Sequence, residues 1–189
     1  FGEYTWVVYL INFVLLAFAL YFSWRISEKY LAGYAAFLPP LMLALHPFVA
    51  QQVYGAYEPF SIFLAVLSVF MFLRYRDTRH IFFLIAASFL LSVWALERPI
   101  ALYLIPIAGS FVFFSHHHVF LKKRRVLHAV LFTLVAMLVV GSWSFRNHRA
   151  LGTWQLGSGG HILLRTTMHA HLSREDFIST ALSYSVGDF

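Results

Sequence analysis

The chain has 189 residues, of which 60% are hydrophobic and only 12% are charged. Its mean hydropathy is +0.72, and soluble domains usually carry ~25% charged residues, so an ordinary water-soluble globule is excluded. The absence of cysteine excludes disulfides and thiolate chemistry. The net charge of +6 comes from short basic clusters between apolar runs, which indicates membrane orientation rather than nucleic-acid binding.

Six apolar runs are candidates for membrane-spanning helices, because a crossing needs about 20 mostly apolar residues. In chain order they cover residues 4–24, 34–49, 59–73, 81–96, 100–114 and 126–143. Pro39, Pro40 and Pro47 predict a kink in the second. The third to the fifth are short, so flanking turns, thin membrane or packing must complete them. We therefore expect an all-α integral membrane bundle of about six helices over residues 1–143, followed by an extracytoplasmic loop region over 144–189.

Charge alternates between the connecting loops and predicts their sidedness. The loops at 25–33, 74–80 and 115–125 are basic, whereas those at 46–58 and 97–99 contain only Arg98. The nine basic residues of the first group are Arg25, Lys29, Arg74, Arg76, Arg79, Lys122, Lys123, Arg124 and Arg125. By the positive-inside rule the basic loops are cytoplasmic, so the other two loops and the chain after Trp143 face the opposite side.

Glu58 is the main candidate for a catalytic acid. It precedes Pro59, which suits the first position of a helix, so its carboxylate stands at the positive end of the third apolar run. One interpretation is a helix-terminal acid that gains only about 0.3–1 kcal/mol from the helix dipole. The other is an acid that acts on a substrate at the outer membrane surface.

Three arginines on the same predicted side could bind an anion. Arg98 follows Glu97 and precedes Pro99, so it either neutralises Glu97 or binds a phosphate through its guanidinium fork. Arg146 and Arg149 follow the aromatic residue Trp143, and they either extend that anion site or anchor the helix end.

Histidines raise the question of a metal site. His161, His169 and His171 could share one zinc ion, but two imidazoles two residues apart suit many geometries and no cysteine supports them. We therefore assign no metal ligands. His116 to His118 lie in a basic cytoplasmic loop, where solvent or lipid headgroups surround them. His46 faces the same side as Glu58 and is kept as a substrate-binding candidate.

Several short motifs, in this order, resemble a known family. The first set consists of Pro39-Pro40, then Leu45-His46-Pro47, then Tyr54 to Phe60, which opens a helix that ends in Leu73-Arg74-Tyr75-Arg76. The second is Trp94 to Pro99, which precedes an apolar helix. The third consists of Ser142 to Asn147, Gly152 and Gly157-Ser158-Gly159-Gly160. Together they resemble C-type membrane glycosyltransferases of the protein O-mannosyltransferase and aminoarabinose-transferase-like group. Glu58 stands where that family more often has Asp, and Ser142 replaces its usual Pro.

The resemblance implies an enzyme that moves a hexose or pentose from a polyprenyl-phosphate carrier to a protein, lipid or glycan acceptor outside the cytoplasm. Carried over, Glu58 lies near the acceptor or a divalent metal ion, Arg98 contacts the lipid phosphate, and Arg146 is a secondary anion contact. The family's principal acid lies in the first external loop, so we expect this chain to be a fragment that starts after that loop and is inactive alone. The membrane is then the bacterial inner or plasma membrane, or the endoplasmic reticulum in a eukaryote.

Two other classes remain open. A transporter or flippase would place ionisable groups near the midplane, often at broken helices, whereas the interiors of these apolar runs hold almost no charge and only Asn12 and the double proline as irregularities. A non-catalytic membrane scaffold would explain the apolar runs, but it would not explain an acid and several arginines on one side.

Overall fold

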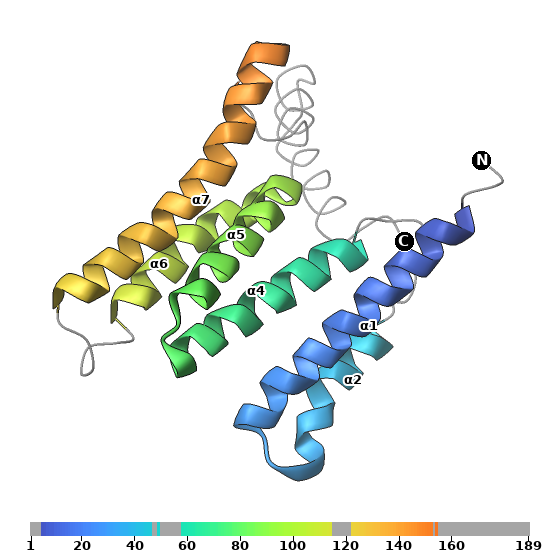
Figure 1. The fold of residues 1–189 in the computed structure, drawn as a ribbon. Coiled ribbons are helices and arrows are strands. Elements are labelled where there is room, and N and C mark those ends of the chain that lie inside the picture. Colours follow the sequence, from blue (N-terminus) through green and yellow to red (C-terminus); the bar gives the residue numbers. More distant parts are fainter. Residues whose placement is uncertain (1–4, 47–48, 50–57, 115–121, 153, 155–189) are drawn as a thin grey trace, which may run out of the picture.

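The computed structural model describes residues 5–46, 49, 58–114, 122–152 and 154. These residues form helices and contain no strand. In chain order the elements are α1 (Thr5–Tyr30), the 3-10 helix η1 (Gly33–Phe37), α2 (Leu38–Leu45), α4 (Glu58–Thr78), α5 (Ile81–Glu97), the 3-10 helix η2 (Pro99–Tyr103), α6 (Leu104–Phe114) and α7 (Lys122–Leu151) (Figure 1). The prediction of an all-α chain is confirmed for this part of the protein.

Among the described residues, three helices are long and apolar enough to cross a membrane: Trp6–Tyr30, Glu58–Thr78 and Lys123–Ala150. The other apolar helices, Gly33–Leu45, Ile81–Glu97 and Pro99–Phe114, are shorter. Helix α5 has 17 residues, and at 1.5 Å per residue it extends only about 26 Å, less than the hydrocarbon core of about 30 Å. The described residues therefore define three candidate spans rather than a clear bundle of six.

The prediction of one kinked helix over residues 34–49 is wrong. The described part of that run is a five-residue 3-10 helix followed directly by the eight-residue α2, which ends at Leu45. Pro39 and Pro40 lie in the first turn of α2, where a missing N–H costs no hydrogen bond. The prolines thus begin a short helix instead of bending a long one, and Pro47 lies outside the described residues.

The long helices extend beyond their apolar runs. Helix α1 continues to Tyr30, α4 continues to Thr78, and α7 begins at Lys122 and continues past Trp143 to Leu151. Long cationic side chains can stay on a helix at a membrane boundary because their heads reach water while their stems cover apolar surface. Arg146 and Arg149 therefore lie on α7 and not in a loop, and most of the expected loop region, 155–189, lies outside the described residues.

The helices pack on neighbours in the chain and also on helices further along it. Helix α1 contacts α2 and α4, α4 contacts α5, α5 contacts α7, and α6 contacts α7 (Figure 1). Only two residues separate α4 from α5, so these helices form an antiparallel hairpin. As a result the start of α4 and the end of α5 meet at one end of the protein, and the basic turns that end α1 and α4 lie at the other.

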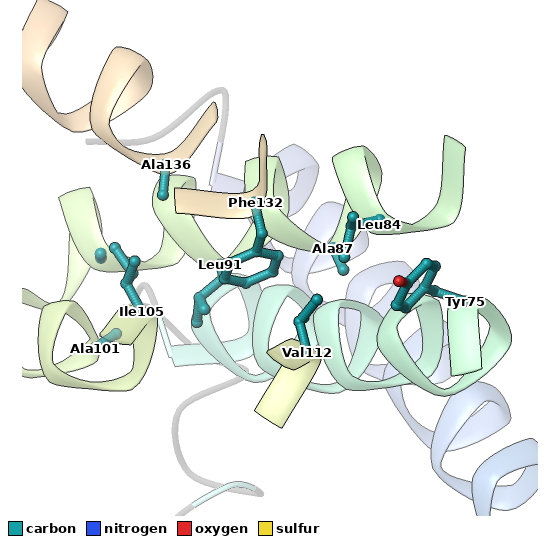
Figure 2. Close-up of a cluster of buried hydrophobic side chains, with 10 residues drawn as sticks. Tyr75, Leu84, Ala87, Leu91, Ala101, Ile105, Val112, Phe132 and Ala136 are labelled. Atoms are coloured by element: carbon teal, nitrogen blue, oxygen red, sulfur yellow. The ribbon is translucent and has the colours of Figure 1, made fainter. Parts of the chain in front are cut away.

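One apolar core joins α4, α5, η2, α6 and α7. Its members are Tyr75, Leu84, Ala87, Leu91, Ala95, Ala101, Ile105, Val112, Phe132 and Ala136 (Figure 2). Two polar contacts cross it: the Ser88 hydroxyl donates to the Phe132 carbonyl at 2.6 Å, and the Tyr75 hydroxyl lies 2.6 Å from His128 Nδ1. Alanine and serine at helix contacts let backbones approach closely and bond across the interface, as membrane helices commonly do.

The outward faces of the long helices remain apolar. Phe13 on α1, and Met137 and Leu138 on α7, are among many large hydrophobic side chains that no described residue covers. A helix that is apolar around its whole circumference is buried in protein or in lipid. Since exposed apolar surface of this extent is rare on monomeric soluble proteins, these faces are compatible with a membrane protein.

Gly109 provides a test of the contact between α6 and α7. A Cβ atom there would lie 3.3 Å from the Thr133 hydroxyl oxygen, tighter than ordinary contact, and 3.9 Å from the Phe132 ring. We expect Gly109→Val to lower the free energy of unfolding by about 1–3 kcal/mol, because the branched side chain forces the helices apart. The matched control is Gly141→Val on α7, where a Cβ atom meets nothing within 4 Å. Thermal unfolding followed by circular dichroism in detergent checks this, and equal melting temperatures for the two variants would contradict it.

Candidate functional site

The candidate site lies where α4 begins and α5 ends. Glu58 is the first residue of α4, and Pro59 follows it in the first turn. Arg98 follows the last residue of α5 and has an extended backbone, with φ of −123° and ψ of 97°. This conformation has a local cause, because the ring of Pro99 disfavours a helical backbone at the residue before it. The two X-Pro sequences therefore mark where α4 begins and where α5 ends, and they place Glu58 and Arg98 side by side at these two helix termini.

Arg98 stands between two carboxylates. Its Nη2 donates to Glu58 Oε1 in a direct ion pair, and its Nε lies 3.8 Å from Glu97 Oε1. The side chains of Arg98, Glu58 and Glu97 keep 43%, 23% and 19% of their surface exposed, so the group is partly withdrawn from solvent. With all three residues ionised its formal charge is −1. The contact across 40 residues of sequence gives the two predicted residues a shared location.

Glu97 is the least satisfied member of the group. Neither of its carboxylate oxygens, which are both buried, has a hydrogen-bond partner among the described residues. It lies just past the apolar run 81–96, and burial raises its pKa above the ordinary value, a rise that the nearby Ser61 hydroxyl partly opposes. Burial of an ionised carboxylate without hydrogen bonds is costly, so burial makes Glu97 easier to protonate than an exposed glutamate.

Two further residues lie beside the charged group, and neither was predicted from the sequence as a site residue, although Trp94 belongs to the motif Trp94 to Pro99. The Trp94 indole Nε1 donates to Ser61 Oγ at 2.8 Å, and this bond ties α5 to α4 next to the charged group. Helical spacing was the feature of the sequence that could have indicated Ser61 and Trp94 as site residues. Ser61 lies three residues after Glu58, and Trp94 lies three residues before Glu97, so each shares a helix face with its acid.

The structure does not bring the other three candidates into this contact. His46 caps the C-terminus of α2, which packs on α1 and η1. The Arg146 guanidinium lies 4.7 Å from the centroid of the Trp143 ring and donates to Asn147 Oδ1 at 3.3 Å. The Arg149 guanidinium lies 4.9 Å from the centroid of the Phe145 ring. These cation–π contacts are the geometry of helix-end anchors.

The described residues contain no group of three or more His, Asp or Glu side chains arranged to hold a metal ion. The histidines considered for zinc, His161, His169 and His171, and the triplet His116 to His118, all lie outside those residues. Glu58 and Glu97 are therefore the only carboxylates at the candidate site in the part of the chain that the structure describes, and Arg98 already neutralises one of them.

Comparisons with models of protein families, with curated proteins and with solved structures find no match for this chain. The described residues define only a class of protein: a helical protein in which three of the described helices have membrane-spanning length and a carboxylate–guanidinium group lies at one end of a helical hairpin.

The raised pKa of Glu97 predicts a pH-dependent effect of its removal. The pKa of Glu97 is higher in the folded protein than in the unfolded chain, where a glutamate has a pKa of about 4.3. At a pH below the unfolded-state pKa the carboxyl contributes its full stabilisation of the fold. That stabilisation is lost as the pH rises through the folded-state pKa. We expect Glu97→Gln, which mimics the protonated acid, to raise the melting temperature relative to the unchanged protein, and to do so more at pH 8 than at pH 5.

The matched control is Glu28→Gln, which removes an exposed carboxylate paired with Arg25 at 2.7 Å. It should show no stabilisation that grows with pH. Melting temperatures from circular dichroism in a single detergent, measured at both pH values, check the prediction. The same shift at both pH values for Glu97→Gln would contradict it.

Proposed function

We propose that this chain is the part of a membrane glycosyltransferase that binds the phosphate of a polyprenyl-phosphate sugar donor on the extracytoplasmic side. The observation that carries the proposal is the ion pair between Glu58 and Arg98. These two residues belong to the separate motifs, Tyr57-Glu58-Pro59 and Glu97-Arg98-Pro99, in which the sequence resembles the C-type family. Because Glu58 and Arg98 are in contact, the two motifs contribute to a single site.

We place all six apolar segments in the membrane, with α1, α4 and α7 as the long spans and the shorter helices leading the chain back between them. The turns that end α1 and α4 contain Lys29, Arg74 and Arg76 and lie in the cytoplasm by the positive-inside rule. The antiparallel hairpin of α4 and α5 then puts Glu58 and Arg98 at the opposite surface, where a lipid-linked sugar presents its phosphate.

Arg98 would stabilise the lipid phosphate that leaves from the anomeric carbon. A guanidinium binds phosphate oxygens through two parallel charge-assisted bonds, and such preorganised donors stabilise charge that develops on a leaving group. The site's formal charge of −1 opposes an anionic ligand only while both acids are ionised. Protonation of Glu97, which burial favours, leaves Arg98 and Glu58 as a neutral pair.

In this proposal the donor phosphate competes with Glu58 for Arg98. When the phosphate takes the guanidinium, Glu58 loses its partner and becomes free to accept hydrogen bonds, or a proton, from the acceptor hydroxyl. The oxygen of that hydroxyl forms the new bond to the anomeric carbon as the bond to the phosphate oxygen breaks. Binding of the donor phosphate to Arg98 therefore frees the Glu58 carboxylate for the acceptor.

The proposal is tested by sugar transfer in proteoliposomes that contain the complete protein and a purified, labelled polyprenyl-phosphate sugar. We expect Glu58→Gln to lower the transfer rate at least tenfold with unchanged expression and membrane insertion. The control Arg124→Gln alters an exposed cation near the start of α7, and it should change the rate less than twofold.

Two outcomes would overturn the proposal. An unchanged rate for Glu58→Gln would remove the acid from the reaction. Movement of the labelled substrate across the bilayer without a glycosylated product would identify a transporter instead.

A further inference from the structure

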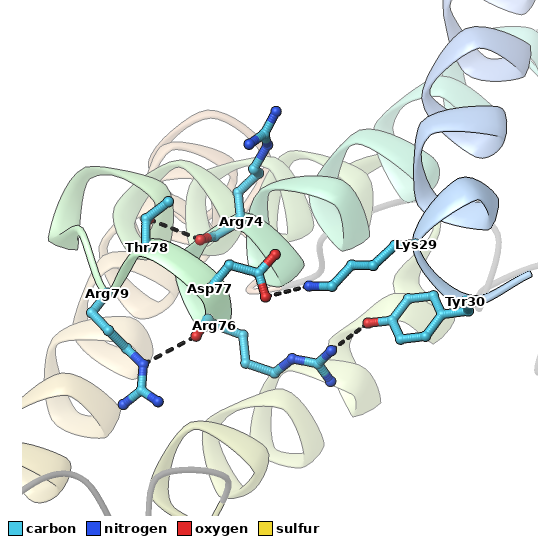
Figure 3. A network of polar contacts seen from close by, with 7 residues as sticks. All are labelled: Lys29, Tyr30, Arg74, Arg76, Asp77, Thr78 and Arg79. Carbon is cyan, nitrogen blue, oxygen red and sulfur yellow. Dashed lines mark hydrogen bonds and ion pairs between the residues drawn. The ribbon is translucent and has the colours of Figure 1, made fainter.

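A polar pocket lies toward the opposite end of α4 from Glu58. It has a volume of about 250 Å³, is open to the surface, and is lined by the C-terminal parts of α1 and of α4. Its polar lining consists of Arg25, Glu28, Lys29, Arg74 and Asp77. Figure 3 shows the contacts on its α4 side, where the Lys29 ammonium reaches the Asp77 carboxylate across the two helices.

The charges of this pocket do not balance. Each carboxylate already has a cation: Arg25 Nη1 lies 2.7 Å from Glu28 Oε2, and Lys29 pairs with Asp77. Arg74 is left without a carboxylate partner among the described residues; its guanidinium lies 5.4 Å from the centroid of the Phe70 ring. Figure 3 shows its head directed away from Asp77. The pocket therefore has one uncompensated, accessible guanidinium.

The remaining lining is apolar and comes from half-buried side chains of α1 and α4. Ile26, Phe70 and Leu73 form it. A cationic rim above an apolar wall suits the boundary between an anionic headgroup and an acyl chain. Pockets for drug-sized ligands have about 300–1,000 Å³, so this smaller space takes a headgroup and leaves the chains in the surrounding lipid.

The walls of the pocket are held in place before any ligand arrives. The Lys29–Asp77 pair and a hydrogen bond from Arg76 to the Tyr30 hydroxyl both join α1 to α4 (Figure 3). A site whose side chains are already ordered loses less conformational entropy on binding. Basic pockets between membrane helices on the cytoplasmic side are suited to anionic lipid headgroups.

We propose that this pocket binds a phosphate-bearing anion, with the Arg74 guanidinium as its principal contact. The two sources of that chemistry are the headgroup of an anionic phospholipid and free inorganic phosphate. The site is separate from the Glu58–Arg98 group and does not depend on glycosyl transfer, so it stands whether or not the chain belongs to an enzyme.

Native mass spectrometry of the full chain in a neutral detergent tests the proposal. We expect one dioleoylphosphatidylglycerol to bind at least tenfold more tightly than dioleoylphosphatidylcholine, which has no net charge. Arg74→Gln should weaken phosphatidylglycerol binding at least fivefold, and Arg74→Lys should retain most of it because the charge remains. Arg124→Gln, which removes an exposed arginine of α7 at the same end of the protein, should change it less than twofold.

Inorganic phosphate added to the phosphatidylglycerol complex distinguishes a lipid headgroup from free phosphate as the ligand of the pocket. No displacement at a hundredfold excess identifies the lipid headgroup as the ligand, and displacement at equal concentration identifies free phosphate; either supports an anion site at Arg74. Equal binding of both lipids, or equal losses in Arg74→Gln and Arg124→Gln, would overturn the proposal.

Discussion

Replacement of Arg98 by alanine is expected to lower sugar transfer by at least a hundredfold, more than any single change to the carboxylates beside it. Arg98 is the cation that contacts both Glu58 and Glu97, and in the proposed reaction it also holds the leaving phosphate. Removal of one preorganised donor to a developing anion costs about 10²–10³ in rate. The same substitution leaves two carboxylates close together with no cation between them.

The conservative variant separates charge from geometry. Arg98→Lys keeps the positive charge but loses the fork that binds two phosphate oxygens at once, so its transfer rate should lie between those of Arg98→Ala and the unchanged protein. Rates are measured with the polyprenyl-phosphate sugar in proteoliposomes, and insertion is checked by protease protection. A normal rate for Arg98→Ala would exclude the arginine from the reaction.

A double-mutant cycle measures the ion pair without any assay of activity. Glu58→Gln and Arg98→Gln, alone and together, should give a coupling energy of about 1–2 kcal/mol, between the values typical of exposed and of buried pairs. The intermediate value follows from the exposure of the Arg98 side chain, which is 43% accessible. A coupling energy near zero would mean that the two residues do not interact in the folded protein.

Replacement of Phe132 by alanine is expected to lower the free energy of unfolding by about 3–5 kcal/mol, the usual cost of removing a buried aromatic ring. Phe132 is 1% exposed and lies among buried residues of α4, α5, α6 and α7. Its ring meets the ring of Phe72 edge-on, with centroids 6.5 Å apart. It also borders an apolar pocket of about 190 Å³, which loss of the ring would enlarge.

The control for this prediction lies on the same helix. Leu134→Ala truncates a side chain that is 53% exposed, so it should cost well under 1 kcal/mol when lipid or detergent covers that face. The hydrogen bond from Ser88 to the Phe132 carbonyl survives in both variants because it uses the backbone. Unfolding by denaturing detergent, followed by circular dichroism, compares them; similar costs would contradict the assignment of Phe132 to the core.

Helix type could be predicted because it depends on local composition. Each of the six apolar runs contains or overlaps a helix in the described residues, since backbone groups in apolar surroundings must bond within their own segment. Helix ends were less predictable. The runs ended at the first charges, whereas α4 continues through Arg74 and Arg76 to Thr78, because long cationic side chains tolerate a helix at a membrane boundary.

Only part of the candidate site could be predicted from the sequence. Glu58 and Arg98 were identified from adjacent prolines and from loop charge, which are local features. Glu97 was recognised only as a neighbour of Arg98, Trp94 was noted only as part of the motif Trp94 to Pro99, and Ser61 was not recognised at all. Their role depends on how α4 and α5 are rotated against each other, and helical spacing alone does not determine that rotation.

By itself the sequence determined an apolar helical chain and the positions beside prolines where α4 begins and α5 ends, while the sidedness of its basic loops stays a prediction. Only the tertiary structure decided that Pro39 and Pro40 begin a helix instead of kinking one, that Arg98 pairs with Glu58, and that Arg146 and Arg149 stack on aromatic rings away from that pair. The physical reason is that helix formation follows from each segment's own residues. Contacts between segments depend on packing, in which side chains distant in sequence compete for the same partners.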